Sequence, residues 1–150
     1  MNVRRKADLL RVELAEAESS LLAGLLDDFS VLLAEPDHAD PVVQRLYPDG
    51  YSDDEAASAE YRELVLADLH ASRTGRLQQC RAELPPGAGR ISLDAEAADR
   101  WLRVLNDLRL ALGTRLGVTE TVELNPAEPA VAIYHWLSAV QDLLVAELMG

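Results

Sequence analysis

The chain has 150 residues, of which 49% are hydrophobic and 27% charged, the balance of a globular protein rather than of a disordered or membrane-spanning one. Its formal charge is −12 at pH 7, and because phosphate backbones attract basic surfaces, we expect no direct binding of DNA by the domain as a whole. With 27 leucines against two Trp, four Tyr and one Phe, the core is expected to be aliphatic and mostly helical.

Hydrophobic periodicity and turn residues divide the chain into short strands and longer helices. The predicted elements, in chain order, are a strand over 9–14, a helix over 15–34, helices over 40–47 and 53–83, a strand over 89–93, and helices over 94–116 and 128–148. Ser52 and Glu55 have the spacing of a capping box at the start of the 53–83 helix. The apolar stripe Ala57, Tyr61, Leu64 and Val65 is the predicted core face of that helix, and the stripe changes phase near Thr74 and Gly75, before Leu77, Cys80 and Leu84.

Two strand–helix segments of the chain can be superposed without a gap. They read RVELAEAESSLLAGLLDDFSVLL, from Arg11, and RISLDAEAADRWLRVLNDLRLAL, from Arg90. An internal pseudo-repeat, whose two strands pair in a small sheet, is one explanation, and chance similarity of two amphipathic helices is the other. The predicted fold class is mainly α: a single compact helical domain over 1–150, with about four main helices and a minor two-stranded β element.

Cys80 is the only cysteine, so the chain cannot form an internal disulfide or a cysteine-only zinc site, and a cytoplasmic location is expected. Arg76 and Arg81 would lower the pKa of an exposed Cys80 thiol. The competing interpretation is a packed or half-exposed structural cysteine. The stretch after the basic opening is interrupted by charges, and no apolar run reaches the roughly 18 residues of a membrane span. We therefore expect neither a signal peptide nor a membrane partner.

The three histidines, the commonest general bases and metal ligands, do not predict a catalytic or metal site. His38 lies beside Asp37 and Asp40, but the flanking prolines favour a surface turn over a metal site. His70 and His135 fall on the helix sides away from the core. The sequence also lacks a phosphate-binding glycine loop and a serine nucleophile elbow. We predict no catalytic residue, cofactor or metal.

One arginine and one aspartate lie where leucines are expected. At about 100° per residue, Arg109 falls at the edge of the apolar arc of helix 94–116, and Asp68 within that of helix 53–83. A buried carboxylate needs a cation or donors, and a guanidinium suits it because its stem packs against apolar neighbours. We therefore predict one polar network, also holding Asn106 and Gln141, that joins three helices. The alternatives are an Arg109 that extends outward along its methylenes, or a small-anion site.

The outer side of the 94–116 helix carries a row of charges with one apolar exception. Asp99, Arg103 and Asp107 are spaced as an i, i+4 ladder, which predicts a solvated face. Leu110 lies on the same side. We hypothesise that it belongs to a homodimer or partner surface, although single exposed leucines are common.

Three stretches of the chain resemble an actinobacterial family catalogued as domain of unknown function 2017. They are DPVVQRLYPDGY, RISLDAEAADRWLRVLNDLRLALGTRLGV and IYHWLSAVQDLLVAEL, which together extend the match over nearly the whole chain. The most specific positions are Trp101, Leu105, Asn106, Asp107, Leu108, Arg109, Gly113 and Trp136. The resemblance implies a cytoplasmic regulatory protein that acts through protein contacts, and it brings no catalytic residue. A thiol switch through an internal disulfide is excluded here, because Cys80 stands alone.

Our leading hypothesis from the sequence is a non-enzymatic regulatory protein in stress-responsive transcription, whose partner belongs to the transcription machinery. The first alternative is an adaptor for Clp-dependent proteolysis, because the family is typically encoded beside the ClpS adaptor. The second alternative is an enzyme that uses the region of Asp68 and Arg109 to bind a small anion. An open pocket at Arg109 would favour this last hypothesis, and a dry ion pair would oppose it.

Overall fold

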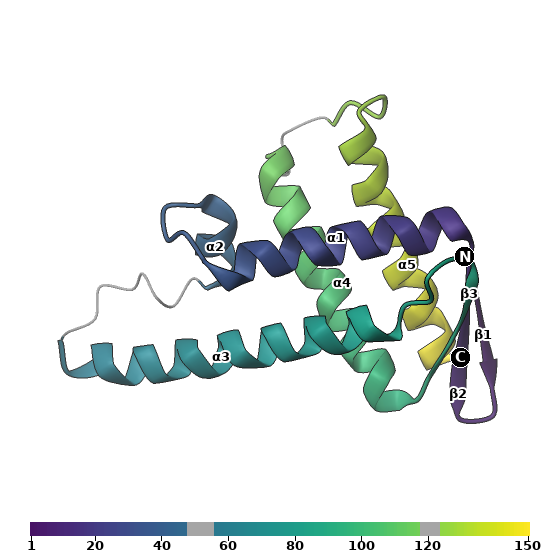
Figure 1. The fold of residues 1–150 in the computed structure, drawn as a ribbon, viewed down its shortest axis with the longest axis horizontal. Helices are drawn as coiled ribbons and strands as arrows, with labels where there is room; N and C mark the ends of the chain where they lie inside the picture. The colour runs from purple at the N-terminus through teal and green to yellow at the C-terminus, as the bar shows by residue number, and fades with distance from the viewer. Residues whose placement is uncertain (48–55, 118–123) are drawn as a thin grey trace.

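The computed structural model describes residues 1–47, 56–117 and 124–150, with the side chains of the third helix from Glu63 onward. Figure 1 shows a mainly helical molecule with a small antiparallel sheet at one end. The helices are α1 (Glu16–Ala34), α2 (Pro41–Leu46), α3 (Ala56–Glu83), α4 (Ala95–Leu116) and α5 (Pro129–Met149). The strands are β1 (Asn2–Lys6), β2 (Leu9–Leu14) and β3 (Gly89–Leu93), in the spatial order β1-β2-β3.

The sheet has three strands, one more than the two predicted. The missed strand is β1, which pairs with β2 in a register that sets Val3 opposite Val12. Its sequence, NVRRK, has a single apolar side chain, so alternation alone could not reveal it. Residues 9–14 and 89–93 form strands as predicted and pair with each other.

The two strand–helix segments of the suggested pseudo-repeat occupy equivalent places. Val12 and Ile91, which are aligned when the two sequence segments are superposed, are cross-strand partners. A local two-fold axis between β2 and β3 would require this register. Leu26 of α1 and Leu105 of α4, also aligned, are both fully buried. The strand register and the burial of these two residues agree with an internal repeat, which stays a prediction beside chance similarity of two amphipathic helices.

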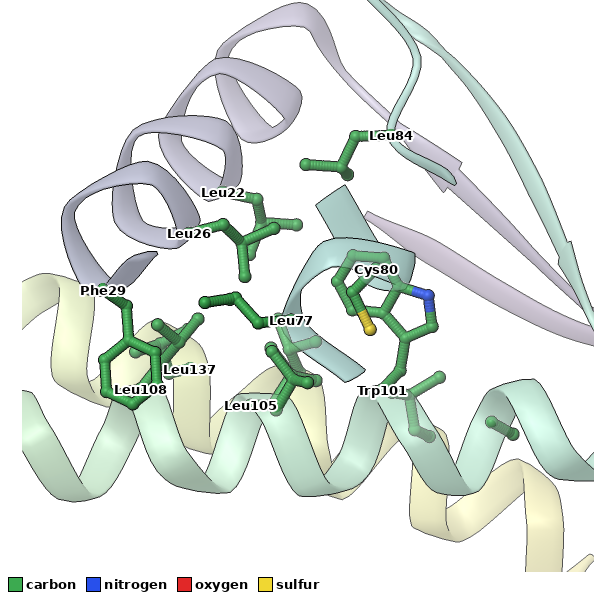
Figure 2. Packing of buried hydrophobic residues seen from close by; sticks show 14 of the residues in the cluster. Leu22, Leu26, Phe29, Leu77, Cys80, Leu84, Trp101, Leu105, Leu108 and Leu137 are labelled. Carbon is green, nitrogen blue, oxygen red and sulfur yellow. The ribbon is translucent and has the colours of Figure 1, made fainter. Parts of the chain in front are cut away.

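Side chains from all five helices and from the sheet meet in one aliphatic core, part of which Figure 2 shows. Leu22, Leu26 and Phe29 of α1 face Leu105 and Leu108 of α4 there. The start of α4 beside this core is fixed by a side-chain cap. Asp94 caps α4 by accepting a hydrogen bond of 2.8 Å from the backbone N–H of Ala97. None of the described helices is long and apolar enough to cross a membrane.

Helix α3 is continuous through Thr74 and Gly75, where the sequence suggests a change of phase. Its second half enters the core, but its first half extends beyond the other helices (Figure 1). Leu64 and Val65, which the periodicity predicts to be buried, are therefore 66% and 41% exposed. The predicted phase is wrong: Leu66 and Leu69 are the residues of this stretch that pack against the core, on the same helix face as the buried Leu77. The proposed capping box at Ser52 and Glu55 lies outside the described residues.

A buried ion pair joins α3 to α4. Arg73 Nε lies 3.0 Å from Asp107 Oδ2, and the two side chains are only 11% and 10% exposed. Arg73 also donates a hydrogen bond of 3.1 Å to the carbonyl of Leu46 at the end of α2, and its guanidinium lies 4.8 Å from the centre of the Tyr47 ring. Burial by itself disfavours the charged guanidinium, but Asp107 and Tyr47 outweigh it and raise the pKa of Arg73.

The prediction that Asp107 belongs to a solvated ladder is therefore wrong. Asp99 and Arg103 do form an exposed i, i+4 pair at 2.9 Å, but Asp107 points into the protein. The wheel failed because α4 has neighbours on several sides: α1, α2, α3 and α5 all contact it. Its buried arc is consequently wider than that of a helix on the surface.

Removing one member of the buried pair should destabilise the fold more than removing both. We expect Arg73→Met and Asp107→Leu each to lower the free energy of unfolding by about 3–5 kcal/mol, because the survivor is left charged and buried. The double substitution should recover much of that loss in a urea-unfolding cycle. The matched control is Arg103→Met with Asp99→Leu, an exposed pair expected to contribute no more than about 0.5 kcal/mol. Equal, additive losses in both cycles would contradict a structural role for the buried pair.

Candidate functional site

An open hollow of about 590 Å³ lies where α2 and α5 flank the second half of α4. Its lining residues are Arg45, Asn106, Arg109, Leu110, Gly113, Thr114, Gly117 and Tyr134. The residues from α4 are spaced three and four apart, so they share one side of the helix. Four of them, Asn106, Arg109, Leu110 and Gly113, were singled out from the sequence. The structure thus brings them to one surface feature.

Arg109 faces this hollow with neutral partners. Its Nη1 donates a hydrogen bond of 3.1 Å to Oε1 of Gln141 on α5, as the predicted network requires. Its guanidinium carbon lies 5.6 Å from the centre of the Tyr134 ring, within cation–π range. Its Nε is buried and has no hydrogen-bond partner among the described residues. The positive charge of Arg109 is therefore positioned by an amide and an aromatic ring rather than by a carboxylate.

Asp68 does not take part in this site. Its side chain is exposed on the projecting half of α3, and no hydrogen bond or ion pair joins it to Arg109, although both residues are described. The predicted ion pair between α3 and α4 does exist, but with the charges exchanged: Arg73 is on α3 and Asp107 on α4. Asn106 is exposed at the hollow and makes no bond to Arg109.

A glycine lets α5 approach the hollow. A Cβ atom on Gly113 would lie 3.1 Å from Cε2 of Tyr134, closer than ordinary van der Waals contact. Gly113 therefore allows the Tyr134 ring to lie against α4, under the guanidinium of Arg109. At the next turn Gly117 ends α4 with φ +70°, a left-handed cap that favours glycine. Both glycines have a structural reason to stand beside the hollow.

The remaining positions singled out from the sequence are structural. Trp101, Leu105 and Leu108 are buried in the core, and the indole N–H of Trp101 donates a hydrogen bond of 2.7 Å to Glu83 on α3. Trp136 is half-buried on α5 and packs against the same core. Leu110 is also half-buried and lines the hollow, so it does not form the exposed apolar spot that the sequence suggests.

Sequence reasoning missed four residues of the hollow: Thr114 and Gly117 of α4, and Arg45 and Tyr134 from the two flanking helices. Arg45 occupies the exposed side of α2, opposite the buried Val42, Val43 and Leu46. Nothing in a six-residue helix predicts which neighbour its outer side meets. Arg115, on α4 between the lining residues Thr114 and Gly117, forms an ion pair of 2.7 Å with Asp40, the residue that caps α2. This contact fixes the start of α2 beside α4.

The thiol of Cys80 is a core group. The side chain is fully buried, and burial, together with the charge of Glu83, raises its pKa to about 12. A thiol made acidic by Arg76 and Arg81 is therefore excluded, and the structural interpretation is confirmed. The helix phase that suggested partial exposure was judged from the first half of α3, whereas Leu77, Cys80 and Leu84 form the stripe that enters the core.

Of the three histidines, His38 and His135 are exposed, the latter as predicted, and His70 is half-buried. His70 was expected to be exposed, but it is half-buried and its Nδ1 is hydrogen-bonded to the hydroxyl of Tyr47 at 3.0 Å. Within the described residues no three His, Cys, Asp or Glu side chains are grouped as metal ligands. His38 and His70 instead line a mostly apolar cleft of about 400 Å³ between α2 and α3.

The chain belongs to the family described as Domain of unknown function (DUF2017), whose model matches residues 1–148. It is 33% identical over 129 residues to the oxidative stress regulator AosR of Mycobacterium tuberculosis (strain ATCC 25618 / H37Rv). The protein of the same name from Mycobacterium bovis (strain ATCC BAA-935 / AF2122/97) is equally similar. These matches cover 74% of this chain and 59% of each relative, so the chain aligns with only about three fifths of those proteins. No solved structure is significantly similar to it.

Cys80 should resist thiol reagents while the protein is folded. With a pKa of about 12, only on the order of 10⁻⁴ of the thiol is ionised at pH 8, and the thiolate is the reactive form. We expect iodoacetamide labelling in the native state to be at least about a hundredfold slower than in urea, followed by mass spectrometry. The free thiol of denatured protein is the internal control. Native labelling as fast as denatured labelling would contradict the burial of Cys80.

Proposed function

We propose that this chain is a cytoplasmic regulatory protein of an oxidative-stress response, and that it acts by binding a partner protein through the hollow at Arg45 and Arg109. The family and the names of two relatives support the regulatory role. The chain aligns with only part of those relatives, so their regulatory role is proposed for this chain rather than assigned to it. A component of the transcription machinery is the partner that we favour.

The observation that carries the proposal is a charge imbalance in the hollow. Two guanidinium groups line it, and its described lining residues include no carboxylate. The chain has 26 acidic residues against 14 basic ones. The lack of a carboxylate beside Arg45 and Arg109 among the described residues that line the hollow therefore does not reflect a shortage of acidic residues. Guanidinium groups bind carboxylates in two-pronged, charge-assisted hydrogen bonds. The hollow therefore suits an acidic side chain of a partner, for which Arg109 is already oriented by Gln141 and Tyr134.

A small anion is the second candidate ligand, favoured by the openness of the hollow at Arg109 and by the exposed Asn106 amide on its wall. Binding alone would not make an enzyme. The described lining residues include no histidine, cysteine or carboxylate, so the hollow itself supplies no general base near neutral pH. An adaptor role in Clp-dependent proteolysis stays an alternative for the partner, and no geometric feature selects it.

Survival of peroxide stress tests the regulatory role. In a host deleted for this gene, the wild-type chain should restore survival, whereas Arg45→Glu should not, because the reversed charge repels an acidic partner. Arg45 is exposed, so the variant should keep its melting temperature. Arg103→Glu, at an exposed position of α4 that does not line the hollow, is the matched control and should restore survival. A deletion without a peroxide phenotype would contradict the role, and full rescue by Arg45→Glu would contradict the use of the hollow.

Thermal shift measurements separate a partner protein from a small anion. A ligand that binds only the folded state raises stability by RT ln(1 + [L]/Kd), about 2.7 kcal/mol at a hundredfold excess over Kd. If the ligand is a protein segment, phosphate, sulfate and malonate should not bind at Arg109. We therefore expect these anions to cause no saturable rise in melting temperature that depends on Arg109. A saturable rise in melting temperature that disappears in Arg109→Gln, but not in Arg103→Gln, would instead establish a small-anion site.

A further inference from the structure

The sheet concentrates positive charge in an acidic protein. Five of the 14 basic residues of the chain lie within its 16 strand residues, where Glu13 is the only acid. These basic residues are Arg4, Arg5 and Lys6 of β1, Arg11 of β2 and Arg90 of β3. The rest of the chain has 25 acids against nine bases. The surface potential of the molecule is therefore divided, with the sheet opposed to the helices.

Strand alternation places most of this charge on the outer face. Val3, Val12 and Ile91 are buried against the helices, so their neighbours Arg4, Arg11 and Arg90 point the other way. A shallow hollow of about 260 Å³ runs over this side, lined by Asn2, Arg4, Arg5, Lys6, Arg11, Glu13 and Arg90. The sheet lies at one end of the molecule, away from α2 and the projecting part of α3 (Figure 1). We call these seven residues the basic face.

Repulsion between like charges on the basic face destabilises the sheet. Arg4 and Arg11 are cross-strand partners in the β1–β2 register and lie on the same face. Like charges in such pairs are destabilising. One pair is compensated, since Arg90 Nη2 lies 3.2 Å from Glu13 Oε1, but no ion pair links Arg4 or Arg11 to an acid among the described residues. An uncompensated cost of this kind is expected where a surface serves function.

Protection of a sheet edge does not explain this arrangement. Charged side chains on an edge strand discourage pairing with other chains, which accounts for Arg5 and Lys6 on β1. However, Arg11 lies on the central strand, β2. Edge protection also works with either sign of charge, and acidic residues prevail elsewhere in this chain.

We propose that the basic face binds a short, acidic segment of a partner protein in an extended conformation. The surface is three strands wide, about 10 Å at 4.8 Å between strands, which a single peptide can cover. A long duplex or a charged membrane would bring many more negative groups near the acidic helices, at distances comparable to the screening length of about 8–10 Å. In addition, β1 is an edge strand with free backbone groups on which an extended peptide can align.

This site is independent of the hollow at Arg45 and Arg109, because none of its residues lines that hollow. The two proposals can therefore fail separately. Substitutions on the basic face should leave any effect of Arg45→Glu unchanged.

Fluorescence anisotropy with a defined peptide tests the proposal. The probe is a fluorescein-labelled decapeptide of alternating Glu and Thr, and its partner control has Gln at every Glu. We expect the intact chain to bind the Glu peptide, more weakly as salt rises, and not the Gln peptide. Arg4→Gln with Arg11→Gln should weaken binding roughly tenfold. Arg81→Gln with Arg103→Gln, which changes the net charge equally at exposed helical sites, should leave affinity within about twofold.

Circular dichroism melts complete the test. Removing the repulsion between Arg4 and Arg11 should leave the melting temperature unchanged or raise it, so loss of binding would not reflect unfolding. The proposal is overturned if the Glu peptide fails to bind, or if both double variants lose affinity equally. It is also overturned if a random-sequence DNA duplex, or vesicles containing phosphatidylserine, bind more tightly than the peptide and lose that binding in the Arg4→Gln, Arg11→Gln variant.

Discussion

The buried ion pair between Arg73 and Asp107 is the constraint on which the arrangement of α2, α3 and α4 depends. A paired charge in a core is costly to form but more costly to break, so the two helices keep the register that brings these side chains together. The third contact of Arg73, to the Leu46 carbonyl, ties the end of α2 to the same point. The position of Arg45, one residue earlier, is thereby set relative to α4. The buried pair of Arg73 and Asp107 thus determines where the exposed guanidinium of Arg45 lies beside the hollow.

Four consecutive residues of α4 serve different neighbours because this helix is surrounded. Asn106 and Arg109 reach the hollow, Asp107 enters the polar contact with α3, and Leu108 packs in the core. The side chains of one helical turn point in all directions around the helix axis, and on a surface helix about half of them face solvent. On α4 the buried arc is wider, because α1, α2, α3 and α5 all contact it, and only positions such as Asp99, Arg103 and Asn106 are exposed. This accounts for a polar residue, Asp107, within an otherwise apolar buried arc.

Sequence periodicity predicted the parts of this fold that are governed by local pattern. Residues 9–14 and 89–93 show strand alternation, and the helices show their apolar faces, so both were recoverable. Whether a face finds a partner is not a local property. Leu64 and Val65 were predicted to face the core, but Leu66 and Leu69 are the residues of this stretch that pack against it, and Asp68 is exposed rather than paired. Strand β1, with one apolar residue, exists because β2 offers an edge. For the candidate site, Arg109 and Gln141 were predicted together, since both lie at core edges. Arg45 depends on tertiary packing that the sequence does not display.

The state of Cys80 limits how this chain could take part in an oxidative-stress response. Oxidation of a thiol needs the thiolate and access for the oxidant, and Cys80 has neither, because burial and the charge of Glu83 raise its pKa to about 12. Nor can a lone cysteine form a disulfide within the chain. Cys80 is therefore not suited to sense an oxidant in the folded chain, and a regulatory role of this chain would act through a change in binding. Surfaces with unneutralised arginines are suited to that task, because the affinity of an ion-paired contact responds strongly to any change in the partner's exposed acids.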